Sequence, residues 1–319
     1  MSQALSKTID PELTEPTLSP GSRPWRRFCR SRSAIVSLII MAVIIIACLA
    51  TLPITTQMYS QQDLDANREP PQFESFALFG YDLLGRNLLW RCLFGGVVSL
   101  GIGLAAAAIS VVIGTVWGAL AGWYGGRIDN AMMRLVDILY GLPYVLMIIL
   151  LKIAFEPKLI KLLNSIFGPG QERVANIVIL FLAIGGVSWL TMARVIRGQV
   201  LSLKTQPFME AARAGGVPTR RILLRHLLPN LIGPIIVYAT LTVPQAILQE
   251  SFLSFLGIGI QAPVPTWGSL AAEGVKAVNT VVSFWWMVFF PSVLLGLTLL
   301  CLNFIGDGLR DALDPKTTR

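Results

Sequence analysis

Charged side chains are scarce in this sequence, and their scarcity excludes an ordinary water-soluble fold. Asp, Glu, Lys and Arg make up 14% of the 319 residues, and hydrophobic residues make up 54%. Soluble domains carry about 25% charged residues, which cover their surface. The composition therefore favours a membrane protein. It also excludes an intrinsically disordered chain, which would be poor in apolar residues.

Cysteine and histidine are also few, which removes common metal and disulfide chemistries. The four cysteines show no C-x-x-C spacing, so they predict neither a metal knuckle nor a disulfide framework. His226 is the only histidine, and no Cys, Asp or Glu lies beside it, so we expect helix-end hydrogen bonding rather than metal binding. No Ser/His/Asp, Cys/His or metal-ligand constellation is present. We therefore predict no catalytic residue and no metal site, and a membrane enzyme is disfavoured.

Long apolar runs are what the sequence does contain. A bilayer core of about 30 Å is crossed by about 20 apolar helical residues. We predict an all-α, polytopic membrane protein with six transmembrane helices. The predicted helices cover residues 34–52, 95–121, 137–155, 175–193, 231–249 and 284–302.

Two of these runs need interpretation. The third is shorter than the others, and Lys152 interrupts it near its end. The first continues past Cys48 and supplies one of an even set of spans. We therefore interpret the first run as a transmembrane helix rather than as a cleaved leader.

The basic residues are distributed unevenly between the two sides that six spans define. Of the 26 Lys and Arg residues, 18 lie in the two tails and the two loops that share one side. The positive-inside rule places that side in the cytoplasm, so we predict a multi-pass inner-membrane protein with both termini cytoplasmic. The predicted regions are a disordered basic cytoplasmic tail at 1–32, the first transmembrane helix with an extracytoplasmic loop at 33–92, a core of five transmembrane helices at 93–306, and a cytoplasmic C-terminal tail at 307–319.

Two prolines and one pair of charges stand out in the predicted spans. Pro143 in the third span and Pro244 in the fifth can kink their helices, which makes them hinge or kink candidates. Transmembrane helices also tolerate proline without a functional reason. Arg134 and Asp137 are three residues apart where the third span enters the membrane. We expect them to pair, because a partner lowers the cost of a carboxylate there.

The connection at 194–230 is long for a compact helical bundle, and long loops tend to be functional. Pro207 can begin a short helix that the glycines at 215–216 would end. A second short helix is predicted over 218–228. The segment is basic with a few apolar side chains, so a helix-turn-helix of this composition suits docking into a groove of a cytoplasmic partner.

The same connection carries a motif. Its sequence is Glu210-Ala211-Ala212-Arg213-Ala214-Gly215-Gly216, followed by His226-Leu227-Leu228-Pro229-Asn230. This pattern resembles the EAA motif of permease subunits of binding-protein-dependent ABC importers.

Further runs extend the resemblance over most of the chain. The matching runs are 80–87, 126–129, 134–137, 193–199, 250–259, 266–268 and 303–315. Together, over roughly residues 75–315, they resemble the dipeptide/oligopeptide permease family, and most closely its oligopeptide permease C subunits.

The run at 80–87 departs from the family pattern G-T-D-x-x-G-R-D at two positions. This chain has Tyr81 and Asn87 where the pattern has Thr and Asp. Four positions of the matching runs are family motif residues to which we assign no role. They are Asp82, Gly85, Arg86 and Trp267.

The resemblance implies a type I ABC importer permease fold with a cytoplasmic coupling helix between transmembrane helices four and five. It also implies the partners: a second permease subunit, two cytoplasmic ATPase subunits and an extracytoplasmic solute-binding protein. The chain has no G-x-x-x-x-G-K-[ST] motif, so ATP and Mg would be used by the ATPase subunits, and this chain would bind no cofactor. The implied cargo is an oligopeptide or dipeptide, with nickel or glutathione as alternatives.

The resemblance further implies that residues 198–230 form a coupling loop. Alternating access driven by ATP needs a rigid element between ATPase and pore, and a short helix seated in the ATPase can be that element. Gly216 would let the chain turn through a left-handed conformation. The expected coupling residues are Glu210, Ala211, Ala212, Gly216, Val217, Arg220 and Arg221.

Simpler interpretations of these residues stay open. Glu210 could form only a local pair with Arg213, and the arginines could serve as anchors near lipid headgroups. Nucleic-acid binding is disfavoured because no aromatic interleaving accompanies the basic residues. A stand-alone secondary transporter would be expected to place ionisable residues at mid-membrane, and none lies well inside five of the six predicted spans.

Overall fold

The computed structural model describes residues 22–63, 65–72, 77–278 and 283–313, and these residues are helical with no strand beyond two isolated bridges. This confirms the all-α prediction. The helices are α1 (Ser22–Phe28), α2 (Arg32–Ala50), α3 (Leu52–Met58), α4 (Leu88–Tyr124), α5 (Gly126–Tyr140), α6 (Tyr144–Phe167), α7 (Glu172–Lys204), α8 (Pro207–Ala214), α9 (Thr219–Ile222), α10 (Leu228–Phe255), α11 (Trp267–Ala277) and α12 (Trp285–Leu313), with a π-helical turn (Leu223–Leu227) before α10.

Five of the predicted transmembrane helices are present as single long helices. By length and composition, α2, α4, α7, α12 and the continuous stretch Thr219–Phe255 can cross a membrane. The pair α5 and α6 makes a sixth span if the two helices count as one. The structure thus agrees with five or six crossings.

The third predicted helix, 137–155, is wrong as a single helix. The chain leaves α5 after Tyr140 and begins α6 at Tyr144, and the two helices are bent by 94°. Pro143 explains the break, because proline has no N–H to donate to the preceding turn and disfavours helical geometry in the residue before it. Hydropathy alone does not report such an angle.

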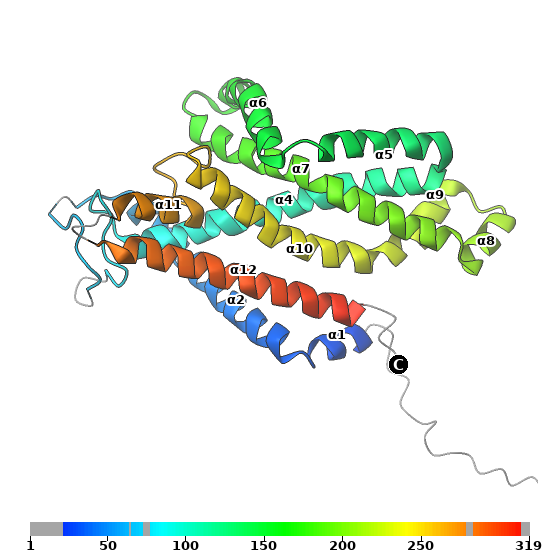
Figure 1. The fold of residues 1–319 in the computed structure, drawn as a ribbon, viewed down its shortest axis with the longest axis horizontal. Helices are drawn as coiled ribbons and strands as arrows, with labels where there is room; N and C mark the ends of the chain where they lie inside the picture. The colour runs from blue at the N-terminus through cyan, green and yellow to red at the C-terminus, as the bar shows by residue number, and fades with distance from the viewer. Residues whose placement is uncertain (1–21, 64, 73–76, 279–282, 314–319) are drawn as a thin grey trace, which may run out of the picture.

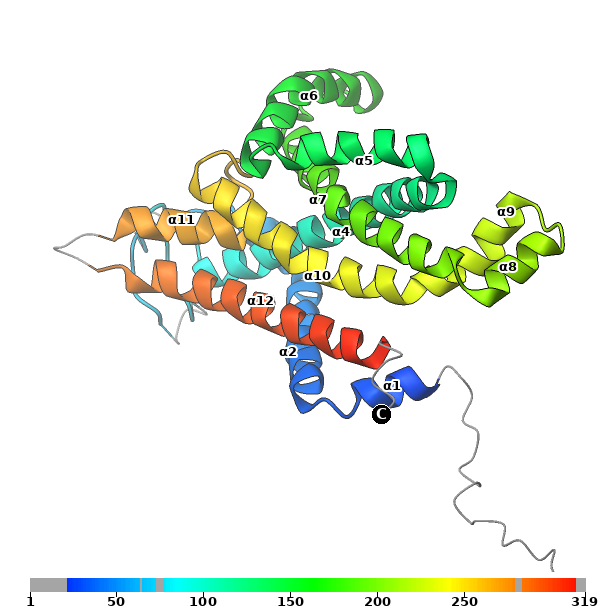
Figure 2. The same ribbon diagram turned by 45° about the vertical axis from the view of Figure 1, so that its right-hand side comes forward.

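The centre of the bundle is formed by α4, α7 and α10, with α4 and α7 side by side over much of their length (Figures 1 and 2). Three glycines four residues apart on α4, Gly114, Gly118 and Gly122, face α7. A Cβ atom at Gly118 would lie 2.4 Å from the carbonyl oxygen of Ala193. Small residues at this spacing let the two backbones touch, which is how transmembrane helices gain packing without a hydrophobic driving force.

The other helices cover two sides of this centre. The α2–α12 pair lies along one side and the α5–α6 pair along the other (Figures 1 and 2). Helices α8 and α9 lie at one end of the bundle, which we call the α8 end. Helix α11 and the connection between α3 and α4 lie at the opposite end, which we call the α11 end.

Both predicted tails are partly helical. Helix α1 packs on α12 through the buried side chain of Phe28, so the predicted disordered tail at 1–32 is wrong for residues 22–32. Residues 1–21 lie outside the described residues. At the other terminus α12 continues to Leu313, so the tail predicted from residue 307 begins within a helix, and residues 314–319 are not described.

The second short helix of the long connection also differs from the prediction. It does not end before Pro229 but runs from Thr219 through the π-helical turn into α10. Proline in the first turn of α10 needs no N–H partner. At this turn the carbonyl oxygen of His226 accepts a hydrogen bond from Asn230 Nδ2 at 2.6 Å.

Candidate functional site

Helix α8 and the turn after it form as the sequence predicts. The helix begins at Pro207 and ends at Ala214. Gly216 has φ +68°. Its N–H donates to the carbonyl oxygen of Arg213, and the Val217 N–H donates to the carbonyl oxygen of Ala212 at 3.2 Å. This pair of bonds is a Schellman motif, which closes a helix and sets the direction of the chain that follows. A Cβ atom at 216 would meet no atom within 4 Å, so the backbone conformation rather than lack of space favours glycine there.

One face of this segment is seated on the bundle. Met209 is fully buried, and it belongs to a cluster with Ile222 and with residues of α7 and α10. Ala212 and Val217 are half-buried against this cluster. Ala212 and Val217 therefore hold α8 on the bundle, and they are not on the surface that a partner could contact.

The opposite face is exposed. The remaining five expected coupling residues all lie there, with charges at three of them. They are Glu210, Ala211, Gly216, Arg220 and Arg221.

The structure does not support the simpler interpretation of Glu210. Among the described residues no ion pair joins Glu210 to Arg213. The Arg213 guanidinium instead lies over the ring of Trp123, 4.9 Å from its centroid. Lys204 at the end of α7 donates to the carbonyl oxygens of Gly122 and Trp123 at 3.1 and 2.6 Å. These contacts fix the base of α8 to the end of α4.

Ion pairs join α5 to α7 beside this end of the bundle. Arg197 donates to both carboxylate oxygens of Asp129 at 2.5 and 2.6 Å. Asp137 pairs with Arg194 at 2.8 Å, so the predicted Arg134–Asp137 pair is wrong. The guanidinium of Arg194 also covers the Tyr140 ring, 3.9 Å from its centroid. Charged groups of both helices line a cavity of about 1200 Å³ here.

The two hinge candidates lie on different elements, and one of them lines a cavity. Pro143 is the last residue of the elbow between α5 and α6, and it lines a cavity bounded by that elbow, α7 and α10. Pro244 is buried inside α10 and precedes Gln245, which lines the same cavity. Pro143 thus lines this cavity, whereas Pro244 lies beside a lining residue and does not line it.

At the α11 end, the run at 80–87 forms a tight turn around a buried carboxylate. Asp82 accepts hydrogen bonds from the backbone N–H groups of Leu84 and Arg86 and from the Arg86 side chain at 2.6 Å. Gly85 has φ +68°, and a Cβ atom there would lie 1.7 Å from the Asp63 carbonyl oxygen. Glycine is therefore required at 85 both for its conformation and for space.

Two further charges complete this cluster. Arg91 on α4 donates to Asp82 at 2.5 Å and to Glu273 on α11 at 2.7 and 3.1 Å. Asp82, Arg86 and Arg91 are buried, while the Glu273 side chain is 35% exposed. The cluster balances two carboxylates with two guanidinium groups, which is the condition for burying charge at low cost. It ties the turn, α4 and α11 together.

Asn87 and Tyr81 fit this turn although they depart from the family pattern. The Asn87 side chain accepts from the Leu89 N–H at 3.0 Å and so caps α4. Asparagine and aspartate are about equally good N-caps. Tyr81 contributes its carbonyl oxygen, which accepts from Trp286 Nε1 at 3.1 Å, and a backbone group does not depend on the side chain.

Trp267 anchors the start of α11. It is fully buried, and its Nε1 donates to the Cys92 carbonyl oxygen at 2.9 Å. Thr266 caps the helix and donates to Glu250 Oε1 at 2.8 Å. Glu250 on α10 is itself fully buried and also accepts from Ser254 at 2.6 Å. The matching runs at 250–259 and 266–268 are therefore one packed unit.

Lys152, which interrupts the third predicted span, is buried with its charge satisfied. Its Nζ donates to the carbonyl oxygens of Ile258 and Gly259 at 2.8 and 3.2 Å, just past the end of α10. Beside it, Asn176 on α7 donates to Glu156 on α6 at 2.9 Å. These bonds tie α6 to α7 and to the chain between α10 and α11.

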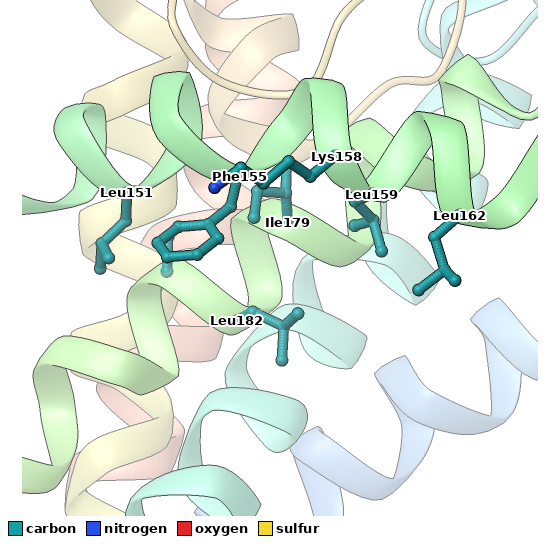
Figure 3. A pocket seen from close by; sticks show the side chains of 8 residues that line it. Leu151, Phe155, Lys158, Leu159, Leu162, Ile179 and Leu182 are labelled. Atoms are coloured by element: carbon teal, nitrogen blue, oxygen red, sulfur yellow. The ribbon is translucent and has the colours of Figure 1, made fainter.

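An apolar pocket of about 290 Å³ lies between α6 and α7 (Figure 3). Figure 3 shows Leu151, Phe155 and Leu182 around it, and Lys158 is the only charged residue among those that line it. Such a surface offers almost no hydrogen-bonding groups, so it does not suit a polar ligand. Among the described residues no cluster of His, Cys, Asp or Glu could hold a metal ion.

Sequence reasoning missed Arg91, Glu273, Arg194 and Glu250 as members of these clusters. A signal was available for Arg91 and Glu250, because an ionisable residue within a transmembrane segment needs a partner. The identity of the partners was not available, since Arg91 and Glu273 are separated by 182 positions.

Comparison with known proteins places most of the chain in known families. Residues 114–319 match the family described as binding-protein-dependent transport system inner membrane component. Residues 19–71 match the N-terminal transmembrane domain of oligopeptide transport permease C.

Two curated relatives cover nearly the whole chain. The oligopeptide transport system permease protein OppC of Escherichia coli is 45% identical over 99% of this chain and 99% of its own length. The dipeptide transport system permease protein DppC of Bacillus subtilis is 40% identical over 96% of this chain and 89% of its own length.

A solved structure shares the fold. A chain of the MetNI methionine ABC transporter, in an inward-facing conformation, superposes with a TM-score of 0.54. The match covers 71% of this chain and 98% of that chain at 18% sequence identity, so it shows the fold alone.

Proposed function

This chain belongs to the family of binding-protein-dependent transport system inner membrane components, and on that premise we propose that it forms one half of the membrane pore of an importer for oligopeptides or dipeptides. Family membership confirms the sequence predictions of a translocation subunit of an ABC importer and of a multi-pass inner-membrane protein. Hydrolysis of ATP belongs to separate ATPase subunits.

The cargo is proposed from the curated relatives. The single observation that carries it is 45% identity, over 99% of both chains, to a permease of an oligopeptide transport system. Both curated relatives described above belong to peptide transport systems, so a peptide cargo is proposed over the nickel and glutathione that the sequence left open. A solute-binding protein would deliver the peptide, and a second permease subunit of similar fold would complete the pore.

The coupling element is proposed to be α8 with the turn at Gly216. Its support is the division of its residues into a buried seat and an exposed, charged face. Met209 and Val217 hold the helix on the bundle, while Glu210, Arg220 and Arg221 face outward. A helix that is fixed at its base and free on one face can transmit the closing of a docked ATPase, together with its bound ATP and Mg, as a rigid-body movement.

The orientation follows from the same proposal. The α8 end would be cytoplasmic, as the distribution of Lys and Arg predicts. Helix α1 and the last turn of α12 lie toward that end (Figure 1), so both termini would be cytoplasmic. The α11 end, with its buried charge cluster, would then face the solute-binding protein.

The test is purification and reconstitution of the transporter from its native host. Tagged chain should co-purify with ATPase subunits and a second permease subunit, and proteoliposomes should take up peptide when ATP and the loaded binding protein are present. A chain that is isolated alone yet transports in vesicles would contradict the proposal.

A Gly216→Trp variant tests the coupling element. We expect normal membrane insertion and at least a tenfold lower peptide uptake for each ATP hydrolysed, since a bulky residue strains the left-handed turn and fills the docking face. Gly126→Trp is the matched control, because Gly126 also has a positive φ, +54°, and open space around it. Normal uptake by Gly216→Trp would refute the coupling role.

A further inference from the structure

The cavity that Pro143 lines has an unusual lining. Its volume is about 440 Å³, and it lies between the α5–α6 elbow, α7 and α10. Among the described residues that line it, none is charged, yet many are polar. They include Tyr140, Tyr144, Tyr238, Thr191, Gln245 and Gln249.

Two glutamines of α10 line the cavity, and one of them has a buried acceptor without a partner, while Gln245 is exposed. Gln245 and Gln249 are four residues apart on α10 and so project from the same face. The Oε1 atom of Gln249 is buried and has no hydrogen-bond partner among the described residues. By contrast, the hydroxyl groups of Ser188 and Thr242 donate to carbonyl oxygens of their own helices. A buried polar atom without a partner is costly unless something else supplies the bond.

The chemistry of these two side chains matches one class of ligand. A carboxamide offers both a carbonyl acceptor and N–H donors, which are the groups of a peptide bond. Moving a peptide group out of water without a compensating hydrogen bond is costly. A peptide that crosses the membrane therefore needs such partners along its route. Uncharged partners serve the backbone that all peptides share, whatever their side chains.

The other described cavities do not offer this combination. The pocket between α6 and α7 is almost entirely apolar (Figure 3). The cavity between α5 and α7 is lined by Arg134, Asp137, Arg194 and Arg197, so it would discriminate between peptides by charge. Of these three cavities among the described residues, the one beside α10 combines neutrality, polarity and an unsatisfied buried acceptor.

We propose that this cavity is a transit site for the backbone of a peptide, and that the carboxamides of Gln245 and Gln249 hydrogen-bond its peptide groups. The proposal rests on the proposed function, since it presumes a peptide cargo. It identifies which residues of this chain contact that cargo, and it explains why Gln249 leaves an acceptor free.

The test compares two cargoes in the complete reconstituted transporter. Trialanine and its backbone N-methylated analogue are supplied with saturating binding protein, and initial uptake rates are measured for the wild type, Gln245→Leu and Gln249→Leu. Each substitution should lower trialanine uptake about tenfold, the factor expected for one lost hydrogen bond. N-methylation removes the same bond from the cargo, so it should slow the wild type more than the variants.

Two controls separate the backbone site from general damage. Gln57→Leu makes the same change on an exposed residue of α3, outside the cavity and outside the coupling loop, and should leave uptake unchanged. Gln249→Asn keeps the carboxamide and should restore most of the trialanine rate. Wild-type rates in Gln245→Leu and Gln249→Leu, or an unchanged ratio between the two cargoes, would overturn the proposal.

A labelling measurement decides the question if the leucine variants fail to assemble. In a Cys29→Ser background, which removes the exposed cysteine, a Gln245→Cys thiol should react more slowly with a small maleimide while trialanine is being transported. Labelling at an unchanged rate would overturn the site. Failure of the wild type to take up any peptide would instead overturn the proposed function, and the site with it.

Discussion

The two ends of the bundle use charged residues in opposite ways. At the α11 end, Asp82, Arg86 and Arg91 are buried and each is paired within the chain. At the α8 end, Glu210, Arg220 and Arg221 are exposed, and among the described residues none of them forms an ion pair. Charges that a chain satisfies internally fix its own shape, while exposed charges on a rigid helix remain available to a partner.

This comparison predicts that substitutions at the α11 end act on stability and substitutions at the α8 end act on coupling. The largest effect is expected for Arg91→Ala. Removing this guanidinium leaves the Asp82 carboxylate buried with only Arg86, and loss of one partner from a buried ion pair costs about 3–5 kcal/mol. The thermal midpoint of the purified complex in detergent should fall strongly. Arg220→Ala, an exposed arginine at the other end, is the control and should leave that midpoint unchanged.

A second pair of variants sharpens the contrast within one residue type. Gly85 and Gly216 share φ +68°, but a Cβ atom clashes with Asp63 at position 85 and meets open space at position 216. Gly216→Ala should lower the free energy of unfolding by about 1–2 kcal/mol, which is the cost of holding alanine in the left-handed conformation. Gly85→Ala should lower the free energy of unfolding clearly more than Gly216→Ala does, because the backbone of the turn must also move. Equal thermal midpoints for the two variants would show that the turn around Asp82 is not rigid.

The smallest effect on stability is expected for Glu210→Gln, since exposed substitutions change the free energy of unfolding by less than about 0.5 kcal/mol. The amount of peptide transported for each ATP hydrolysed should nevertheless fall about tenfold if the Glu210 carboxylate bonds to the ATPase. The ratio of peptide transported to ATP hydrolysed measures this. Glu172→Gln makes the same change on an exposed glutamate at the start of α7, and it should leave the ratio as it is.

Local signals allowed much of the α8 end to be predicted from the sequence. Pro207 and the glycines at 215–216 determine where α8 begins and ends, and both signals act within a few residues. The spans themselves follow from apolar composition. Pro143 was identified as a kink candidate, but an angle of 94° depends on what the two helices pack against, which a single segment does not encode.

Contacts between distant segments explain what could not be predicted. Arg134 and Asp137 have the spacing of a helical pair, yet Asp137 reaches Arg194, 57 positions away. Asp82 was noticed only as part of a motif, because its partner Arg91 and their shared neighbour Glu273 come together only when α4 and α11 pack. The same holds for the cavity, whose walls come from four helices.

The continuity of α9, the π-helical turn and α10 has a mechanical consequence. From Thr219 beside the proposed coupling turn to Gln249 in the cavity wall, the chain is continuously helical with no loop, and the hinge candidate Pro244 lies within it only near the cavity. At 1.5 Å per residue its span is about 45 Å. A tilt of about 5° about the Thr219 end would therefore carry the glutamines sideways by about 4 Å, roughly one peptide unit of an extended cargo.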